Sequence, residues 1–129
     1  MLDHLAILCR DLSASASFYD AVLPALGVAR LMVHPQSGMG YGTAPKPDFW
    51  LQQAPPELPQ REVHIAFAAP DRTSVRAFYD AAVAAGGRSL HAPRVWPEYH
   101  ANYYGAFVRD LDGNNVEAVC HSAEGTVDV

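Results

Sequence analysis

Hydrophobic positions along this chain form a short continuous run and then recur at helical spacing, and this succession occurs twice. Each half opens with a short apolar run, LAILC at 5–9 and IAFAA at 65–69. Apolar runs of this length, bounded by turn or cap residues, are typical of strands. Apolar residues then recur at three- or four-residue spacing, over 12–26 and over 75–85. That second period predicts one helix in each half.

Polar residues and glycines mark where the two predicted helices begin and end. Asp11 stands before the first helix and Asp71 before the second, and such side chains accept hydrogen bonds from free N–H groups of the first turn. Gly27 and the pair at 86–87 follow the helices. Glycine tolerates left-handed dihedral angles, so we expect both helices to stop there.

Three further short strands are expected after each helix. The predicted ranges are 28–34, 38–43 and 48–52 in the first half, and 88–95, 103–111 and 115–121 in the second. The turn LDGNN at 111–115 contains Asp-Gly, which is a strong hairpin signal. The sequence therefore predicts an α+β fold of two tandem βαβββ modules, over 1–53 and 63–123, within a single domain of residues 1–129. The proline-rich segment 54–62 is expected to link them.

The two modules are also related in sequence. Shifting the chain by 60 residues lays HLAILCRDLSASASFYDAVLPALG (4–27) on HIAFAAPDRTSVRAFYDAAVAAGG (64–87) without a gap, with nine identities in 24 positions. The tetrapeptide FYDA occurs in both copies. We interpret this match as a tandem duplication of one module.

Candidate metal ligands follow from the alternation of side chains along the predicted strands. His4 and His64 occupy the same place in the two copies, each two residues before an alanine on the same strand face. In the last strand, Glu117 falls opposite to its apolar neighbours and joins the face that carries the histidines. A carboxylate there needs a partner, and two histidines with one carboxylate suit a divalent metal. A lone histidine or glutamate is more often structural. The histidine at the same place in both copies is what favours a metal site here.

Composition excludes several other functions. The net charge is −5 and the nine Lys and Arg residues are scattered, so we expect no nucleic-acid partner. No apolar run approaches the roughly 18 residues of a membrane helix, and the N-terminus carries no basic signal region. We therefore expect a cytoplasmic protein with no membrane partner and with reduced cysteines at Cys9 and Cys120.

Together these residues resemble the vicinal oxygen chelate superfamily, which contains glyoxalase I, bleomycin-resistance proteins and type I extradiol dioxygenases. The histidine of each first strand, the helix segment Ser15–Asp20 and the D-x-D-G-N-x-x-E motif at Asp110–Glu117 carry the resemblance. It implies that the sheets of the two modules form a curved cup around a metal ion. It also implies a homodimer, in which modules of different subunits can complete each cup.

The superfamily has four equivalent ligand positions, and the resemblance places His4, His64 and Glu117 at three of them. The fourth position falls on Trp50 when PDFWLQ (47–52) is laid on NNVEAV (114–119). Glyoxalase I usually has a carboxylate or a similar ligand there, so Trp50 argues against that activity. The remaining set resembles the ligands of extradiol dioxygenases and of fosfomycin-modifying thiol transferases. Fe, Mn, Ni, Co and Zn all remain open as the metal.

Further candidates lie in the segment 94–110, which is dense in functional groups. Histidine serves as a general acid or base near neutral pH, which makes His100 a candidate for proton transfer. One of two adjacent tyrosines is expected to hydrogen-bond a metal-bound oxyanion. Core aromatic positions and a surface histidine are the structural alternatives. The candidates are His100, Tyr103 and Tyr104 for catalysis, and Trp50, Arg94, Tyr99 and Arg109 for substrate binding.

The function expected from these observations is a metal-dependent enzyme acting on a small oxygen-bearing substrate by bidentate chelation. Lyase, isomerase and dioxygenase reactions all fit this expectation. The alternative is a metal-free protein of the bleomycin-resistance type that sequesters a drug or a metabolite. The presence of all three candidate ligands favours the enzyme.

Overall fold

The computed structural model describes residues 1–128, and within them two βαβββ modules follow one another. The first contains β1 (Leu5–Cys9), α1 (Leu12–Val22), the short 3-10 helix η1 (Leu23–Leu26), β2 (Ala29–His34), β3 (Gly38–Thr43) and β4 (Lys46–Gln53). The second contains β5 (His64–Ala68), α2 (Arg72–Ala84), β6 (Arg88–Val95), β7 (Tyr104–Arg109) and β8 (Asn115–Cys120). The α+β class and the two modules predicted from the sequence are confirmed.

Each module forms its own four-stranded mixed sheet. The strand orders are β1-β4-β3-β2 and β5-β8-β7-β6, and in each sheet the first strand runs parallel to the last one. The registers of the two sheets correspond, because Ala6 pairs with Trp50 where Ala66 pairs with Glu117. The predicted equivalence of Trp50 and Glu117 is therefore confirmed.

Both helices begin after the aspartates that the sequence indicated, but α1 ends at Val22, and the 3-10 helix η1 covers the residues up to Gly27. The side chain of Asp11 accepts a hydrogen bond from the backbone N–H of Ala14 at 3.0 Å, and Asp71 accepts one from Ser74 at 2.7 Å. Gly27 ends the η1 turn with a φ of 77°, a left-handed value that glycine adopts without strain. Within the described residues, neither helix is both long and apolar enough to cross a membrane.

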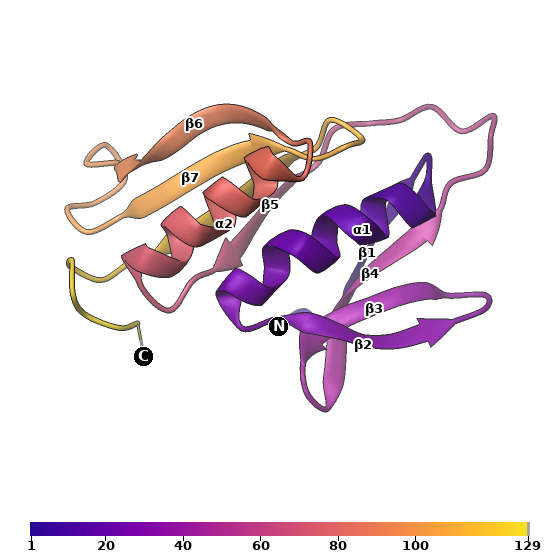
Figure 1. Cartoon of the computed structure of the whole chain (residues 1–129), viewed down its shortest axis with the longest axis horizontal. Coiled ribbons are helices and arrows are strands. Elements are labelled where there is room, and N and C mark those ends of the chain that lie inside the picture. The colour runs from indigo at the N-terminus through magenta and orange to yellow at the C-terminus, as the bar shows by residue number, and fades with distance from the viewer. Residues whose placement is uncertain (129) are drawn as a thin grey trace.

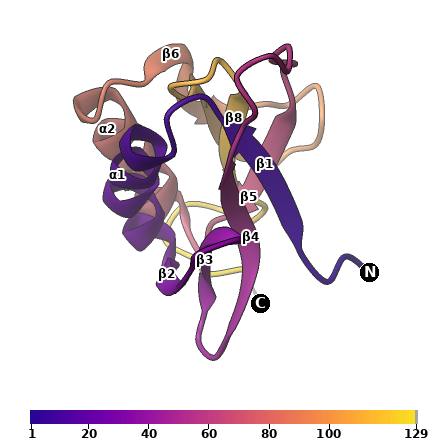
Figure 2. The same cartoon turned by 90° about the vertical axis from the view of Figure 1, so that its right-hand side faces the viewer.

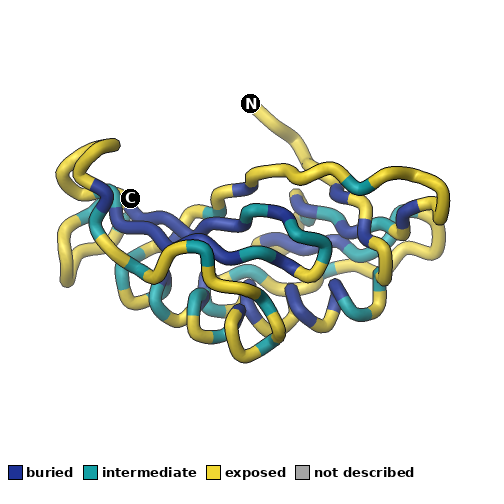
Figure 3. The backbone as a smooth tube through the Cα atoms, turned by 90° about the horizontal axis from the view of Figure 1, so that it is seen from above, coloured by how far each residue is buried: buried dark blue, intermediate teal, exposed yellow. Residues whose placement is uncertain are grey.

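The two helices lie side by side on one face of the strands, and the other face of both sheets is left without a helix (Figures 1 and 2). Buried residues therefore gather between helices and strands, while the loops and the N-terminal segment are exposed (Figure 3). The ring of Phe49 in β4 meets that of Phe67 in β5 edge to face, with centroids 5.1 Å apart. One hydrophobic core thus extends through both modules.

The turn between β7 and β8 joins the second module to the first. Asp110 is buried, and its carboxylate accepts hydrogen bonds from the Tyr19 hydroxyl at 2.7 Å and from the side-chain amide of Asn114 at 3.1 Å. Its other oxygen accepts from the backbone N–H groups of Asp112 and Asn114. Asp112 in turn accepts from the backbone N–H of Arg10 and the hydroxyl of Ser15. The D-x-D-G-N motif is therefore a connector between modules.

Candidate metal centre

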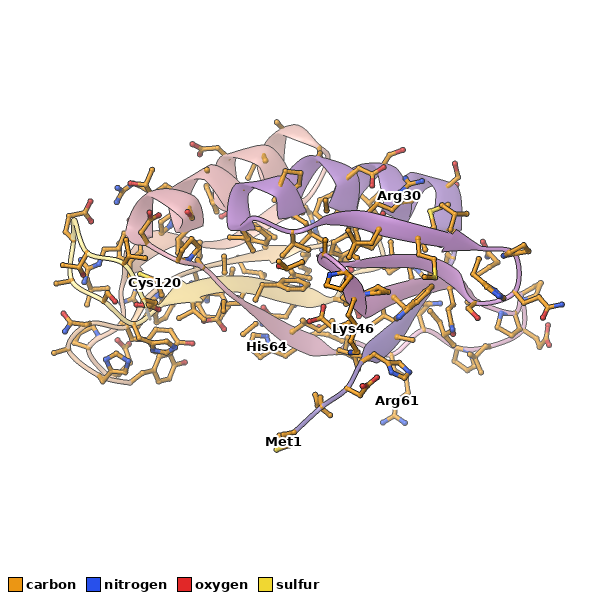
Figure 4. All side chains as sticks on the ribbon, turned by 90° about the horizontal axis from the view of Figure 1, so that it is seen from below. Met1, Arg30, Lys46, Arg61, His64 and Cys120 are labelled. Carbon is orange, nitrogen blue, oxygen red and sulfur yellow. The ribbon has the colours of Figure 1, made fainter. Side chains whose placement is uncertain are left out.

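The open face of the second sheet carries the candidate ligands. Along β7 and β8, Tyr104, Ala106, Val108, Val116, Ala118 and Cys120 belong to the core beneath the helices. Side chains alternate along a strand, so Phe107 and Glu117 lie on the opposite face. His64, at the start of β5, lies on that same side of the sheet, away from both helices (Figure 4). The side chains of His64 and Glu117 thus lie on one face of the second sheet.

Glu117 is a buried carboxylate held between two side chains. Only 1% of the residue is exposed. Its Oε1 atom lies 3.1 Å from Nε2 of His64, and its Oε2 atom accepts a hydrogen bond from the hydroxyl of Tyr103. Burial, and then the bond to Glu117, raise the pKa of Tyr103, so this hydroxyl keeps its proton and acts as a donor.

The hydrogen bonds of His64 fix which of its nitrogens is free. Nδ1 lies 3.1 Å from the backbone carbonyl of Asn115, which can only accept, so Nδ1 carries the hydrogen. In the neutral ring, Nε2 then holds a lone pair that faces the carboxylate oxygen Oε1 of Glu117. Two acceptors that face each other at this distance require a cation or an additional proton between them.

These donors fit a divalent metal ion. A metal-bound histidine usually donates its second ring N–H to a carbonyl or a carboxylate, and His64 does so through Nδ1. Nitrogen and oxygen ligands lie about 2.0–2.2 Å from an ion such as zinc, so two neighbouring ligands of one ion lie roughly 3 Å apart. The observed separation of Nε2 and Oε1 matches that value.

His4 has the same arrangement but lies farther out. Its Nδ1 atom is 2.7 Å from Oδ1 of Asp3, which leaves Nε2 free, and its side chain is 60% exposed. The bond to His4, and then that to Lys46, lower the pKa of Asp3. His4 and His64 both line a cleft of about 400 Å³ between the two modules. Among the described residues, however, no three His, Cys, Asp or Glu side chains converge closely enough to hold a metal. The structure thus brings together two of the three predicted ligands.

Trp50 lies beside His4 on the first sheet. Both residues line a second cleft, of about 330 Å³. Gly40 makes room for the indole ring, because a Cβ atom at that position would come within 2.9 Å of it. A tryptophan side chain therefore occupies the place that corresponds to Glu117 in the other module.

The two adjacent candidate tyrosines point to opposite faces. Tyr103 reaches Glu117, whereas Tyr104 packs in the core beneath α2, where its hydroxyl accepts a hydrogen bond from Arg76. His100 does not contact Glu117 directly: its Nε2 atom lies 2.8 Å from Nδ1 of His121. Of the three predicted catalytic residues, the structure brings only Tyr103 to Glu117.

The candidate arginines are both engaged with neighbouring groups. Arg94 stacks on the ring of Trp96 at 3.4 Å and lies 3.5 Å from Glu98. Arg109 donates hydrogen bonds to Glu62 at 2.6 Å and to the carbonyl of Gly113 at 2.7 Å. Tyr99 differs from both, since it is 60% exposed and its ring lies 4.8 Å from that of Tyr103.

Some residues that shape the site were not anticipated. Asn115 contributes only its carbonyl oxygen, and a backbone group leaves no signature in the sequence. Asp3 is adjacent to His4, so its role in fixing that ring was detectable from the sequence. Gly105 lies next to the Glu117 carboxylate, and a Cβ atom there would stand 3.1 Å from Oε2 and 3.3 Å from the Tyr103 ring.

The substitution Gly105→Ala is expected to destabilise the protein by about 1–3 kcal/mol, because the new methyl group crowds Glu117 and Tyr103. Urea unfolding measures the effect. Removing the Tyr103 ring should relieve the crowding, so Tyr103→Ala with Gly105→Ala should cost clearly less than the sum of the single changes. Additive costs would show that the methyl group acts elsewhere.

Several solved structures share this fold. A glyoxalase/bleomycin resistance protein from Albidiferax ferrireducens T118 is 27% identical, with a TM-score of 0.79 over 91% of this chain and 96% of that one. A glyoxalase/bleomycin resistance protein/dioxygenase family enzyme from Burkholderia phytofirmans PsJN is 21% identical, with a TM-score of 0.72 over 94% and 98%. A lactoylglutathione lyase from Agrobacterium tumefaciens is also 21% identical, with a TM-score of 0.64 over 97% and 93%.

Among curated proteins, no relative of this chain was found. The sequence pattern of one family, however, matches residues 1–118, which include both modules up to the strand that carries Glu117. The match agrees with the fold. The chain belongs to the glyoxalase/bleomycin resistance protein/dioxygenase superfamily.

Proposed function

We propose that this chain is a metal-dependent enzyme in which His4, His64 and Glu117 hold a divalent ion. The supporting observation is the free Nε2 of His64 facing Oε1 of a buried carboxylate, since a cation satisfies both lone pairs. Nitrogen and oxygen donors suit Fe, Mn, Ni, Co or Zn. The bound ion acts as a Lewis acid toward two neighbouring oxygens of a small substrate.

The surrounding residues orient the ligands. The hydroxyl of Tyr103 donates a hydrogen bond to Oε2 of Glu117. Oε1 is therefore the oxygen that remains to bind a metal ion. The Asn115 carbonyl and the Asp3 carboxylate hold the Nδ1 atoms of the two histidines, and both rings offer Nε2 as the ligand atom. Partners of this kind fix ligand orientation and raise ligand basicity.

Tyr103 is the residue we propose for contact with the reacting oxygens. It keeps its proton and lies beside Glu117, so its hydroxyl can exchange the bond to Glu117 for one to an oxyanion that develops next to the ligands. Trp50 forms a wall next to His4, and the exposed ring of Tyr99 offers a surface for the substrate. Lyase, isomerase and dioxygenase reactions all use such a site. Direct substrate contacts by Arg94 and Arg109 require that their present bonds be exchanged.

We further propose that the chain acts as a homodimer and that His4 reaches the ion either within one chain or from the second copy. Two observations motivate this. His4 is exposed and lies apart from the His64–Glu117 pair. The face that carries all three ligands has no helix over it (Figure 2).

Metal analysis of protein purified without chelator tests the ligand set. Wild type is expected to retain about one ion per chain, and His64→Ala or His4→Ala to retain less than about a tenth of it. His34→Ala is the matched control, since His34 is exposed and bonds only the hairpin residues Gln36 and Ser37 among the described contacts. Full occupancy in His64→Ala would overturn the assignment, provided that circular dichroism shows the wild-type fold.

Mixing variants tests whether subunits share the site. If His4 comes from the second copy, mixed dimers of His4→Ala and His64→Ala contain one intact site each, and metal content recovers to about a quarter of wild type. If each chain provides all its ligands, mixing restores nothing. Gel filtration of both variants should first confirm that they form dimers that exchange subunits.

A metal-free protein that sequesters an aromatic drug or metabolite is the second candidate. Aromatic rings follow one another along the open face, with His91, Trp96 and Phe107 in mutual contact. In this case a proton between His64 and Glu117 replaces the ion, and the pair serves only the structure. Failure of added Mn, Fe, Ni or Zn to bind would favour this candidate.

A further inference from the structure

We propose that His100 and His121 form a clasp that positions Tyr103 against Glu117 and that opens when either imidazole takes up a proton. His100 lies in the loop 96–103 between β6 and β7, and His121 directly follows β8. Their ring centroids lie 5.1 Å apart with the planes inclined by 27°, and Nε2 of His100 lies 2.8 Å from Nδ1 of His121. The clasp makes both histidines positioning residues, and it does not depend on which ion the site binds.

The partners of the two rings determine where their hydrogens lie. The backbone N–H of Asn102 donates to Nδ1 of His100 at 3.1 Å, so that nitrogen carries no hydrogen. Neutral His100 is then protonated on Nε2 and donates to Nδ1 of His121. Neutral His121 keeps its own hydrogen on Nε2. In the neutral pair, both hydrogen bonds are therefore satisfied at the same time.

One additional proton breaks this arrangement. On His100 the proton must go to Nδ1, where it faces the N–H of Asn102. On His121 it must go to Nδ1, where it faces the N–H on Nε2 of His100. The first position removes the bond from Asn102 and the second removes the bond between the rings, so either one breaks the chain of hydrogen bonds that holds the loop. Both side chains are on the surface, and histidine is the residue that takes up protons between pH 5 and 8. The clasp is thus closed at higher pH and opens as the pH falls.

The positions of the ring hydrogens also argue against a metal between His100 and His121. A metal on Nε2 of His100 would force the hydrogen of the neutral ring onto Nδ1, toward the Asn102 N–H. This is the reverse of His64, whose Nδ1 faces a carbonyl oxygen and whose Nε2 is free. The two histidine sites are therefore built for different partners, a hydrogen bond between two neutral rings in one and a cation in the other.

Both rings of the clasp contact Tyr103. The Tyr103 ring centroid lies 5.5 Å from that of His100 and 5.3 Å from that of His121, with interplanar angles of 72° and 86°. The two imidazoles thus pack with their planes nearly perpendicular to the phenol ring, whose hydroxyl donates to Glu117. Opening the clasp releases the loop on which Tyr103 lies and leaves this bond without its lateral support.

Several charged and titratable groups lie around the clasp. Asp128 accepts a hydrogen bond from the backbone N–H of His121 at 2.8 Å. The loop also carries Tyr99 and Glu98, and Glu98 pairs with Arg94. Glu124 in the same tail pairs with Arg76 at 2.9 Å, so that carboxylate is already compensated.

Nuclear magnetic resonance of the labelled protein tests the clasp directly. At pH 8, imidazole ¹⁵N shifts should show His100 protonated on Nε2 only, with a scalar coupling across the hydrogen bond to Nδ1 of His121. Between pH 8 and 5, either this coupling should disappear or Nδ1 of His100 should become protonated. The ring signals of Tyr103, assigned with Tyr103→Phe, should shift with the same midpoint.

Three variants separate positioning from a general structural role. His121→Ala should show the low-pH Tyr103 signals at every pH, while His34→Ala should titrate like wild type. His121→Asn keeps an acceptor near the position of Nδ1 but cannot be protonated, so it should restore the pH 8 signals that His121→Ala loses. Tyr103 signals that ignore pH, or that are unchanged in His121→Ala, would overturn the proposal. Because every reading is taken on chelator-treated protein, failure of the metal proposal leaves the result unaffected.

Discussion

Replacement of Asp110 by alanine is expected to lower the free energy of unfolding by about 3–5 kcal/mol, a large share of the roughly 5–15 kcal/mol available to a domain. Its buried carboxylate accepts four hydrogen bonds, two from side chains and two from backbone N–H groups. Alanine leaves these donors without a partner in a place that water does not reach. Burial, and then the charge of Asp110, raise the pKa of Tyr19 well above its usual value, so its hydroxyl remains one of those donors.

Urea unfolding followed by fluorescence measures this effect. Asp112→Ala is the matched control in the same turn, because Asp112 is less buried and accepts from only the Arg10 N–H and the Ser15 hydroxyl. We expect a cost of about 1–2 kcal/mol for that change. Tyr19→Phe, which removes a single donor, should cost about 1 kcal/mol. If Asp110→Ala costs no more than Asp112→Ala, the turn does not couple the modules in the way the hydrogen bonds indicate.

The fold was largely predictable because its signals are local and occur twice. Each strand, each N-cap aspartate and the glycine after each helix is marked within a few residues of the sequence, and the 60-residue offset makes one half a check on the other. Alternation along strands was enough to place Glu117 on the open face, and the register of the parallel strands confirmed Trp50 as its counterpart. These features depend on backbone periodicity, which the sequence expresses directly.

The site was less predictable, because loops and hydrogen positions decide it. The sequence gives no means of telling that Tyr103 turns toward Glu117 while Tyr104 turns under α2. Nor does it reveal that His100 contacts His121, which lies 21 residues further along the chain. The motif at 110–117 has two roles: its aspartates connect the modules, and its glutamate faces His64. The spacing of these residues in the sequence does not show which of them has which role.

Replacement of Glu117 by glutamine is expected to abolish metal binding and, at the same time, to stabilise the metal-free protein. The glutamine amide donates to the free Nε2 of His64, and its oxygen still accepts from Tyr103, so the two facing lone pairs become a hydrogen bond. We expect a gain of about 1–3 kcal/mol, which at roughly 4 °C per kcal/mol raises the melting temperature measurably. Affinity for Mn²⁺ or Zn²⁺, measured by titration calorimetry, should fall by roughly 100-fold or more.

The stability and the metal affinity of Glu117→Gln, taken together, distinguish the two candidate functions. Glu62→Gln is the control, since Glu62 is exposed and pairs with Arg109 outside the site, and it should change neither reading. If the metal-free protein instead holds a proton between His64 and Glu117, the glutamine removes an ion pair between a buried carboxylate and a half-exposed histidine, and it should destabilise the protein rather than stabilise it. Lower stability together with no metal binding in wild type would support the sequestering protein. Wild-type affinity in Glu117→Gln would remove Glu117 from the ligand set, because a neutral amide cannot replace a carboxylate at a divalent ion without loss of affinity.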